Sequence, residues 1–339
     1  MVNSLHILII GGGSVGKRHA RNLHMAGCKI SCMDPRADRR DEIKKELLVE
    51  SVYANLEQIP EPGKIHGVVV ASPTSFHKEH TLWSIKAGLP TLLEKPAAMT
   101  LLQANEIQEA TKQYNVPVLL GYSWRWWPPL QKVKKLLEDK KVGKLRHVQF
   151  HMSAHLADWH PWEPYQSFFM SKKELGGGAL LDESHWIDLM IWLLGSPESV
   201  RGTVSKLSNL EIETDDNVDI ICTYPGANVT IHLDLFGRPH EKFIRFVGDS
   251  GTIIWSANPN RISFSDQLDQ EWQVEDFTYD RNDMFIGTAR EFMAIINGSR
   301  SPVTCTIDDG VLVMDVIEAV RESSATGNTI RLKDLQESL

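Results

Sequence analysis

The sequence has little cysteine, no long hydrophobic run and no excess of positive charge, and each shortage excludes a class of protein. Four cysteines are scattered over 339 residues, too few for a disulfide scaffold or a zinc ribbon. No apolar run approaches the ~18 residues of a membrane helix. With 36 Lys and Arg against 44 Asp and Glu, the net charge is −8, which gives no global basic footprint for nucleic acid or anionic lipid. We therefore expect neither nucleic acid nor a membrane as a partner.

The composition that is present is typical of a globular protein. Hydrophobic residues make up 42% and charged residues 24%, which argues against a disordered chain. At roughly 150 residues per domain, the length predicts about two domains. The apolar run at 5–10 ends in glycines, which favours a buried strand over a signal peptide, so we expect a cytoplasmic protein. Tryptophan is concentrated: seven of the ten lie between Trp124 and Trp192.

The spacing of apolar runs predicts an α/β chain with two differently built parts. Predicted strands at 5–10, 29–33, 67–71, 91–93 and 116–122 alternate with helical segments, which is typical of a doubly wound parallel sheet. After about residue 122 the predicted strands, at 144–155, 198–210, 218–224, 228–236, 243–247 and 252–255, are mostly joined by turns, which indicates an antiparallel sheet. One helix is predicted from the glycines at 176–178 through 194, and two more at 282–297 and 308–325. We expect domains at 1–122 and 123–339, the first a Rossmann domain and the second an α+β domain with a large open, mainly antiparallel sheet.

A glycine loop follows the first predicted strand and opens a helix. In Gly11-x-Gly13-x-x-Gly16, the first glycine permits a tight turn, the second lets the backbone approach a pyrophosphate and the third lets helix pack on strand. The helix N-terminus, at Ser14 and Val15, offers free amide donors to the phosphates. This arrangement predicts a dinucleotide site, with a plain glycine turn as the alternative.

An acidic residue ends the second predicted strand. Asp34 lies 18 residues after Gly16, where a carboxylate binds the adenosine ribose hydroxyls and repels a 2′-phosphate. It therefore favours NAD. Arg36, Arg39 and Arg40 follow closely and leave NADP possible, or else form a solvated helix face.

Two further strand ends are expected at the same edge of the sheet, where ligands bind. The first is Ala71-Ser72-Pro73-Thr74, in which Pro73 can line the cofactor site. Capping of the next helix alone would explain the serine and threonine of this loop. The second is Glu94-Lys95-Pro96. A lysine at the tip of a buried strand is unusual, and a surface ion pair is its alternative explanation.

These motifs together resemble the Gfo/Idh/MocA oxidoreductases, which include glucose–fructose oxidoreductase and inositol dehydrogenase. The resemblance rests on the glycine loop with Asp34, Ser72-Pro73-x-x-x-His77, Glu94-Lys95-Pro96, Gly121-Tyr122-x-x-Arg125-x-x-Pro128, and the run from Gly176 to Asp182-x-x-His185-x-x-Asp188. It spans nearly the whole chain. It implies a Rossmann domain followed by a domain whose open sheet often forms the oligomer interface, hence a homodimer or homotetramer.

The chain departs from the family pattern at one place. Many members have Asp-x-x-x-His, whereas Asp182 and His185 are three residues apart, and one residue of helix rotates a side chain by about 100°. The shorter form is similar to a subgroup associated with bacterial surface-sugar gene clusters, as is the segment 158–165.

The resemblance implies hydride transfer between a nicotinamide and a carbinol carbon. Histidine suits the proton transfer because its unperturbed pKa of roughly 6.5 lies near working pH, so His185 is predicted as the acid/base, with a core histidine as the alternative. Lys95 is predicted to stabilise the reacting oxygen and Asp182 to act beside His185. Asp188 is the alternative residue that could orient His185, although its position three residues later on the same helix side favours a structural role. No metal is expected.

The predicted binding residues form two sets. Those for NAD, or possibly NADP, are Gly11, Gly13, Ser14, Val15, Gly16, Asp34, Arg36, Ala71, Ser72, Pro73, Thr74, His77, Glu94, Lys95 and Arg125. Those for a sugar or sugar-nucleotide substrate are Lys95, Tyr122, Trp124, Arg125, Trp159, His160, Trp162, Tyr165, Asp182 and His185. Aromatic rings beside polar groups suit a sugar, with a packed irregular loop as the alternative for 151–167 and a domain-interface ion pair as the alternative for Arg125. A redox-neutral enzyme that retains its cofactor and a non-catalytic nucleotide sensor are the competing functions.

Overall fold

The structure is a computed structural model that describes residues 4–59, 62–159, 163–266, 271–299, 301 and 303–337. Its contacts divide the chain into two compact units. The first unit is Met1–Ser123 with Arg281–Val311, and the second is Trp124–Asp280 with Leu312–Leu339. The predicted second domain, 123–339, differs from this division because the segment Arg281–Val311 returns to the first unit.

Close contacts explain why this segment joins the first unit. Helix α8 (Asn282–Ile296) contacts helix α1 (Ser14–Met25). Gly67, which begins strand β4 (Gly67–Val70), has no side chain where Phe292 and Ile296 approach: a Cβ there would lie 3.0 and 2.6 Å from their side-chain atoms. The apolar face of α8 therefore covers the start of a central strand, which a linear reading of the sequence does not reveal.

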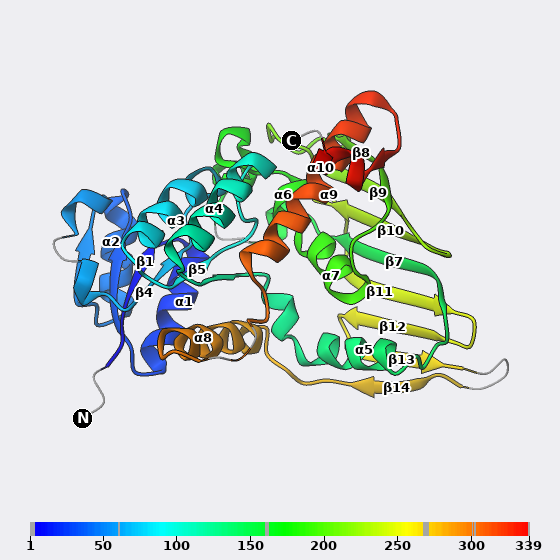
Figure 1. Ribbon diagram of the computed structural model, residues 1–339, viewed down its shortest axis with the longest axis horizontal. Coiled ribbons are helices and arrows are strands. Elements are labelled where there is room, and N and C mark those ends of the chain that lie inside the picture. Colours follow the sequence, from blue (N-terminus) through cyan, green and yellow to red (C-terminus); the bar gives the residue numbers. More distant parts are fainter. Residues whose placement is uncertain are drawn as a thin grey trace. The chain divides into compact units, whose positions relative to one another are not determined.

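The first unit is built on a six-stranded parallel sheet in the order β3-β2-β1-β4-β5-β6. Figure 1 labels three of these strands, β1, β4 and β5. The residues Ile7 to Ile10 of β1 are fully buried, as expected for a strand covered on both faces. The alternating pattern of strands and helices is confirmed, although β3 was not predicted. Besides β4, the strands are β1 (His6–Ile10), β2 (Lys29–Met33), β3 (Ser51–Tyr53), β5 (Thr91–Leu93) and β6 (Val118–Leu120). Besides α1 and α8, the helices are α2 (Ala37–Glu46), α3 (His77–Lys86) and α4 (Leu101–Tyr114).

The second unit is built on a nine-stranded sheet in the order β14-β13-β12-β11-β7-β10-β9-β8-β15, in which β7 and β10 form the parallel pair and all other neighbours are antiparallel. The predicted fold class is confirmed. The strands are β7 (Leu145–Ser153), β8 (Ser199–Ser205), β9 (Asn217–Tyr224), β10 (Ala227–Asp234), β11 (Glu241–Gly248), β12 (Thr252–Ala257), β13 (Asn260–Ser265), β14 (Gln273–Asp276) and β15 (Ile330–Arg331). The helices are α5 (Pro128–Glu138), α6 (Ala179–Asp182), α7 (His185–Leu194), α9 (Ile307–Thr326), which begins in the first unit, and α10 (Leu332–Glu337).

One face of this sheet is covered and the other is open. Helices α5, α6 and α7 contact β12, β13, β9, β10 and β7 (Figure 1). Side chains that alternate with the buried ones remain exposed, including His147, Ile221 and Arg245. The unpredicted strands β13 and β14 extend this sheet, and β14 is exposed along its whole length.

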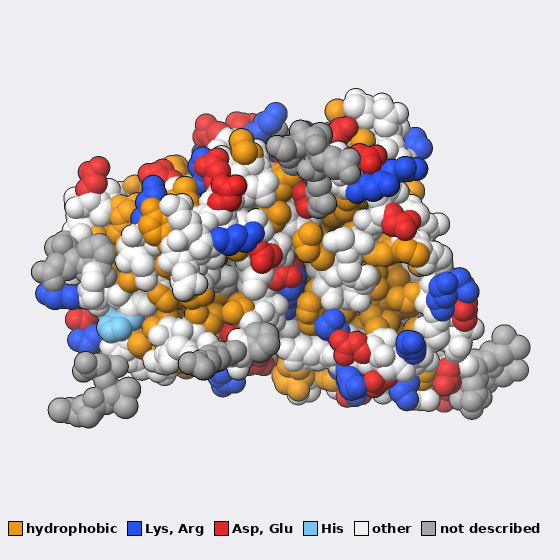
Figure 2. Space-filling model, in the orientation of Figure 1, with side chains coloured by type: hydrophobic (Ala, Val, Ile, Leu, Met, Phe, Trp, Pro, Cys, Tyr) orange, Lys and Arg blue, Asp and Glu red, His pale blue; other side chains and the backbone are white. Residues whose placement is uncertain are grey.

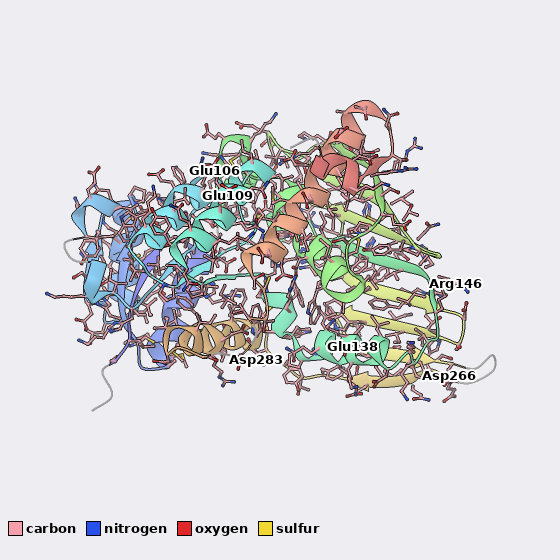
Figure 3. The ribbon with its side chains drawn as sticks, in the orientation of Figure 1. Glu106, Glu109, Glu138, Arg146, Asp266 and Asp283 are labelled. Carbon is pink, nitrogen blue, oxygen red and sulfur yellow. The ribbon has the colours of Figure 1, made fainter. Side chains whose placement is uncertain are left out.

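Charged side chains of both signs are interspersed on the face of the molecule shown in Figure 2. Some of them join neighbouring helices or loops. On α4, which carries Glu106 and Glu109 (Figure 3), the Glu106 carboxylate pairs with the Lys78 amine on α3 at 3.0 Å. Arg146, also labelled in Figure 3, pairs with Asp249 at 2.6 Å. Exposed pairs of this kind stabilise little, and they do not position the functional residues.

Candidate active site

The glycine loop of the first unit is shaped by close backbone contacts. Gly11 has a φ of +99°, and a Cβ there would lie 2.5 Å from the carbonyl oxygen of Ala71. A Cβ at Gly16 would lie 1.8 Å from the carbonyl oxygen of Gly11. Both positions therefore require glycine. Ser14 and Val15 are exposed at the first turn of α1, and Gly13 precedes that helix with no side-chain cap, so the helix N-terminus is open to an anion.

Asp34 is held against this loop. It follows β2 and is 3% exposed, and its Oδ2 accepts a hydrogen bond from the Gly12 amide at 2.7 Å. Its Oδ1 accepts one from the Arg36 amide at 2.9 Å. These bonds fix a carboxylate at the place where a ribose hydroxyl is recognised in this type of fold.

The three nearby arginines have different partners. Arg36, predicted to bind the cofactor, has its guanidinium on Asp38, with Nε 3.1 Å from Oδ1. Arg40 donates to the backbone oxygen of Asp34 at 2.6 Å. Arg39 lies over the loop, because its Nη1 is 3.1 Å from the position of a Cβ on Gly13 and 3.9 Å from Asp34 Oδ2. Arg39 is therefore the arginine nearest the glycine loop.

The loop after β4 carries four of the predicted cofactor residues. Ala71, Ser72 and Pro73 are half-buried, and Thr74 is buried at the start of a 3₁₀ turn. His77, also predicted to bind the cofactor, is 1% exposed, and its Nδ1 and Nε2 lie 2.8 and 2.9 Å from the carbonyl oxygens of Pro96 and Ser72. Its ring therefore links the two loops, and its role toward the cofactor stays a prediction.

The Glu94-Lys95-Pro96 element follows β5, and its two charged residues differ in burial. The Glu94 carboxylate is buried and points to His19 on α1, with Oε1 2.6 Å from Nε2. The role of Glu94 as a cofactor ligand stays a prediction. Lys95 is half-buried. His19 was not predicted, because a single histidine on an amphipathic helix gives no sequence signal of its partner.

In the second unit, two glycines precede α6, and Asp215, from a distant part of the chain, contacts the first turn of that helix. A Cβ at Gly177 would lie 2.2 Å from the carbonyl oxygen of Met170, and Gly178 has a φ of +115°. The Asp215 side chain accepts from the Leu180 amide at 2.8 Å and its carbonyl accepts from Ala179 at 3.0 Å, which caps the helix. Burial raises the pKa of Asp215. Asp215 is thus a supporting residue that the sequence did not reveal.

The predicted single helix over 176–194 is wrong, because α6 ends at Asp182 and α7 begins at His185. Between them the amide of Ser184 bonds to Leu181 at 3.4 Å and that of Trp186 bonds to Glu183 at 3.0 Å. These are bonds to the third preceding residue, as in a 3₁₀ turn. Asp182 is 3% exposed and His185 is half-buried.

Arg125 forms a buried ion pair. Its Nη2 lies 2.7 Å from Asp188 Oδ1, its Nε lies 3.1 and 3.2 Å from the two carboxylate oxygens, and the side chains are 2% and 0% exposed. Both residues belong to the second unit. Two donor nitrogens of Arg125 therefore hold Asp188 on α7, and the role of Arg125 as a cofactor and substrate ligand stays a prediction.

The predicted sugar-facing residues lie in different environments. Trp124 packs edge-on against Trp127 and Trp255, at 5.8 and 5.4 Å between ring centroids, and is half-buried. Tyr122, in the first unit, is fully buried, and its role toward substrate stays a prediction. Of the predicted residues in the irregular segment, Trp159 and Tyr165 are half-buried. His160 and Trp162 lie outside the described residues.

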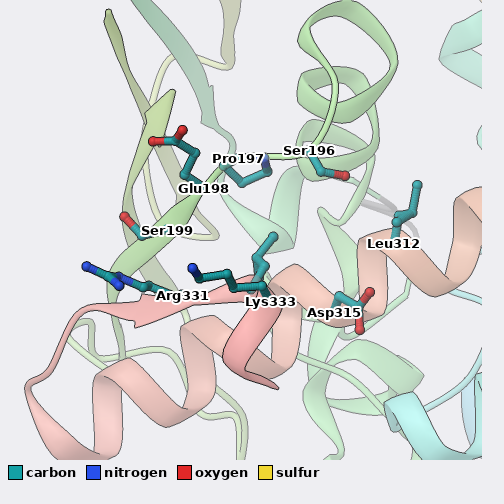
Figure 4. A pocket seen from close by; sticks show the side chains of 9 residues that line it. Ser196, Pro197, Glu198, Ser199, Leu312, Asp315, Arg331 and Lys333 are labelled. Atoms are coloured by element: carbon teal, nitrogen blue, oxygen red, sulfur yellow. The ribbon is translucent and has the colours of Figure 1, made fainter. Parts of the chain in front are cut away.

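Other possible sites in the described structure do not use the predicted residues. Figure 4 shows a hollow in the second unit lined by nine residues, among them Glu198, Asp315, Arg331 and Lys333, and none of the nine is a predicted site residue. Within the described ranges, no group of three or more His, Cys, Asp or Glu side chains is placed to hold a metal ion. No helix in those ranges combines the length and apolar character needed to cross a membrane.

Comparison with known families identifies both parts of the chain. Residues 5–122 match the profile described as "Oxidoreductase family, NAD-binding Rossmann fold", and residues 130–254 match the "GFO/IDH/MocA C-terminal domain". The chain belongs to the Gfo/Idh/MocA oxidoreductase family. It is therefore an oxidoreductase whose Rossmann domain binds NAD, and the observed glycine loop fits that cofactor: Gly11 and Gly16 admit no side chain, and the Asp34 carboxylate is fixed beside them.

Individual proteins and solved structures also resemble this chain. The chain is 29% identical over 219 residues to "Myo-inositol 2-dehydrogenase" of Thermotoga maritima, a match that covers 63% of each protein. It is 29% identical over 341 residues to "Rhizopine catabolism protein MocA" of Rhizobium meliloti, covering 95% of this chain and 98% of that one. Among solved structures, levoglucosan dehydrogenase in complex with NADH and levoglucosan aligns with a TM-score of 0.85 at 21% identity, covering 97% of this chain and 100% of that one.

Proposed function

We propose that this protein is an NAD-dependent dehydrogenase or reductase that acts on a carbinol carbon of a sugar, sugar nucleotide or cyclic polyol. The observation that carries the proposal is the half-buried Lys95 at a strand end of the same unit as the glycine loop and Asp34. The names of the inositol and levoglucosan dehydrogenases support this substrate class. When bound, NAD supplies the acceptor of the hydride.

Lys95 and His185 would divide the proton chemistry between them. Lys95 carries a compact positive charge that stabilises the oxygen of a carbinol as it loses its proton. His185 accepts that proton in oxidation and returns it in reduction, which an imidazole does well near neutral pH. His185 begins α7 and is half-buried, so its ring combines access with a fixed backbone.

Asp182 can act beside His185 although the two are one residue closer in sequence than in the usual family pattern. Residues four apart share one side of an α-helix, whereas residues three apart eclipse in a 3₁₀ turn. The hydrogen bonds from Ser184 and Trp186 have the 3₁₀ spacing. The tightened turn thus compensates for the missing residue, and we assign Asp182 the orientation of the His185 ring.

The segment after β7 would recognise the sugar. Trp159 and Tyr165 are half-buried, and Tyr165 is anchored by its hydroxyl, which accepts a hydrogen bond from the Glu211 amide at 3.2 Å. Aromatic faces pack well against the apolar C–H faces of a sugar ring.

A substrate panel tests the proposal. Cyclic polyols, free sugars and nucleotide-activated sugars are incubated with NAD or NADP, and absorbance at 340 nm is followed. We expect at least one member of these classes to give substrate-dependent NADH. Turnover of a substrate with no net change in NADH would favour the redox-neutral alternative, and tight NADH binding with no turnover of any compound would favour a sensor.

We also propose that a second copy of this chain covers the open face of the second sheet. That face exposes Ile221, at 51%, and carries Phe243 half-buried beside His151, with ring centroids 4.9 Å apart. An antiparallel sheet with apolar residues on an uncovered face is suited to association. Light scattering on a gel-filtration column should give a dimeric or tetrameric mass that Ile221→Lys reduces; a monomeric wild type would refute the proposal.

A further inference from the structure

A buried pair joins the cofactor helix to the loop that carries Lys95. His19 lies on α1, one turn after the glycine loop, and is fully buried. Its Nε2 is 2.6 Å from Oε1 of Glu94, which is 8% exposed at the end of β5. A carboxylate only accepts hydrogen bonds, so Nε2 carries the proton in this contact. The other ring nitrogen, Nδ1, is buried with no hydrogen-bond partner among the described residues.

The residues around Glu94 leave space for its carboxylate and donate a hydrogen bond to it. A Cβ at Gly121, which follows β6, would lie 3.1 Å from the carboxyl carbon, so that glycine makes room for the group. The second oxygen, Oε2, lies 3.3 Å from the amide nitrogen of Lys95. Burial opposes ionisation, but the hydrogen bond and the electrostatic effect of His19, together with the charge of Lys95, outweigh it and keep the pKa of Glu94 below its usual value.

Lys95 is held from its other side as well. His77 contacts the carbonyl oxygens of Ser72 and Pro96 at 2.9 and 2.8 Å, so it ties the β4 loop to the residue that follows Lys95. The backbone on each side of Lys95 therefore has a buried histidine contact, and the contact through Glu94 leads back to α1. The Lys95 side chain is half-buried between these two fixed positions.

We propose that His19 is a positioning residue for the reaction: through Glu94 it fixes the backbone of Lys95 relative to the helix whose N-terminus receives the cofactor phosphates. This inference rests on the proposed function for the role of Lys95. A displacement of about 1 Å in a reacting group can cost on the order of a hundredfold in rate. Loss of the pair therefore affects kcat more than it affects cofactor affinity, whereas a purely structural link would lower stability without that split.

The test compares three variants and includes a measurement on the protein without cofactor. His19→Leu removes the hydrogen bond, His19→Gln restores a side-chain N–H donor, and His24→Leu makes the same replacement later on α1, outside this pair. Hydrogen–deuterium exchange of the segment 94–98 reports the coupling directly. We expect at least tenfold faster exchange there in His19→Leu, and rates within threefold of wild type in His19→Gln and His24→Leu.

Kinetics complete the test. With a substrate from the panel, His19→Leu should lower kcat at least tenfold while the Kd for NADH changes less than threefold, and His19→Gln should recover most of the loss. If His19→Leu does not fold, Glu94→Leu, which removes the acceptor of that hydrogen bond, is measured in its place with the same expectation. Wild-type exchange at 94–98 together with unchanged kcat would overturn the proposal. If the wild type turns over no substrate, the proposed function fails, and the exchange measurement alone still decides whether the pair holds the loop.

Discussion

The glycine loop of the first unit and the α6–α7 segment of the second unit carry the two halves of the proposed chemistry, and they are built differently. The loop is determined by backbone contacts that leave no room for a Cβ at Gly11 or Gly16. The α6–α7 segment also has a close backbone contact, at Gly177, but it depends in addition on side chains far away in sequence, since Asp215 caps α6 and Arg125 holds Asp188 on α7. A constraint on the backbone appears in the sequence as a glycine at fixed spacing, whereas a side-chain pair leaves no local pattern.

The largest expected effect comes from breaking the buried pair that holds α7. Arg125→Leu removes the ion-pair partner of a fully buried carboxylate, which should destabilise the protein by about 3–5 kcal/mol. Unfolding in urea measures this loss. The double variant Arg125→Leu, Asp188→Leu also removes the buried carboxylate and should recover at least half of it; a double variant as unstable as the single one would mean that the pair is not the cause.

The next largest effect is expected from a substitution in the glycine loop, which should chiefly weaken cofactor binding. Gly16→Ala places a methyl group 1.8 Å from the Gly11 oxygen, so the loop must move, at a cost of about 1–3 kcal/mol. NADH affinity, measured by fluorescence titration, should fall at least tenfold. Gly63→Ala is the control, because its added Cβ would meet no atom within 4 Å. Equal affinities of the two variants for NADH would show that the close approach at Gly16 is not needed.

These two regions also show which parts of the fold and of the candidate site could be predicted from the sequence. The parallel sheet, the antiparallel sheet, the glycine loop and Asp34 were all predicted, because each depends on local pattern or backbone constraint. The break between Asp182 and His185 was missed, since a one-residue change in hydrogen-bond spacing leaves the apolar pattern of the helix intact. The His19 contact with Glu94 was missed because its partners are 75 residues apart. The return of α8 to the first unit depends on a space above Gly67 that only the fold reveals.

A smaller effect is expected from changing cofactor preference within the loop. Asp34→Ser removes the carboxylate that should bind the ribose hydroxyls and leaves Arg39 beside the loop. A hydrogen bond to a charged group contributes about 1.5–3 kcal/mol, so NADH affinity should fall roughly 10- to 100-fold, while NADPH affinity should hold or rise. Asp41→Ser, an exposed position on α2, is the matched control. An unchanged ratio of the two affinities would contradict the role given to Asp34.

The smallest effect on stability is expected from a partly exposed cluster on the open sheet face, His232 with Asp219 and Asp234, in contrast to the buried Arg125–Asp188 pair. The hydrogen bond to Asp234, assisted by the one to Asp219, raises the pKa of His232 to about 9 against the opposing effect of burial. Because the folded-state pKa lies above the unfolded value of about 6.5, the stabilisation is complete below pH 6.5 and is lost as the pH rises through 9.

Thermal unfolding of wild type and His232→Asn measures this contribution. The difference in Tm should be a few degrees at pH 6 and should vanish by pH 10. His147→Asn, an exposed position on the same sheet face, should show no such trend. A Tm difference for His232→Asn that is independent of pH would exclude the charged pair as its source.

The most direct test of the central claim is to compare wild type with His185→Asn, using the substrate and nicotinamide cofactor that the panel identifies. Absorbance at 340 nm gives turnover, and fluorescence titration gives NADH affinity. We predict that the replacement lowers kcat by about 10²- to 10⁴-fold and leaves the NADH Kd within threefold of wild type, because His185 moves a proton and does not bind the cofactor. Full turnover by His185→Asn would contradict the account.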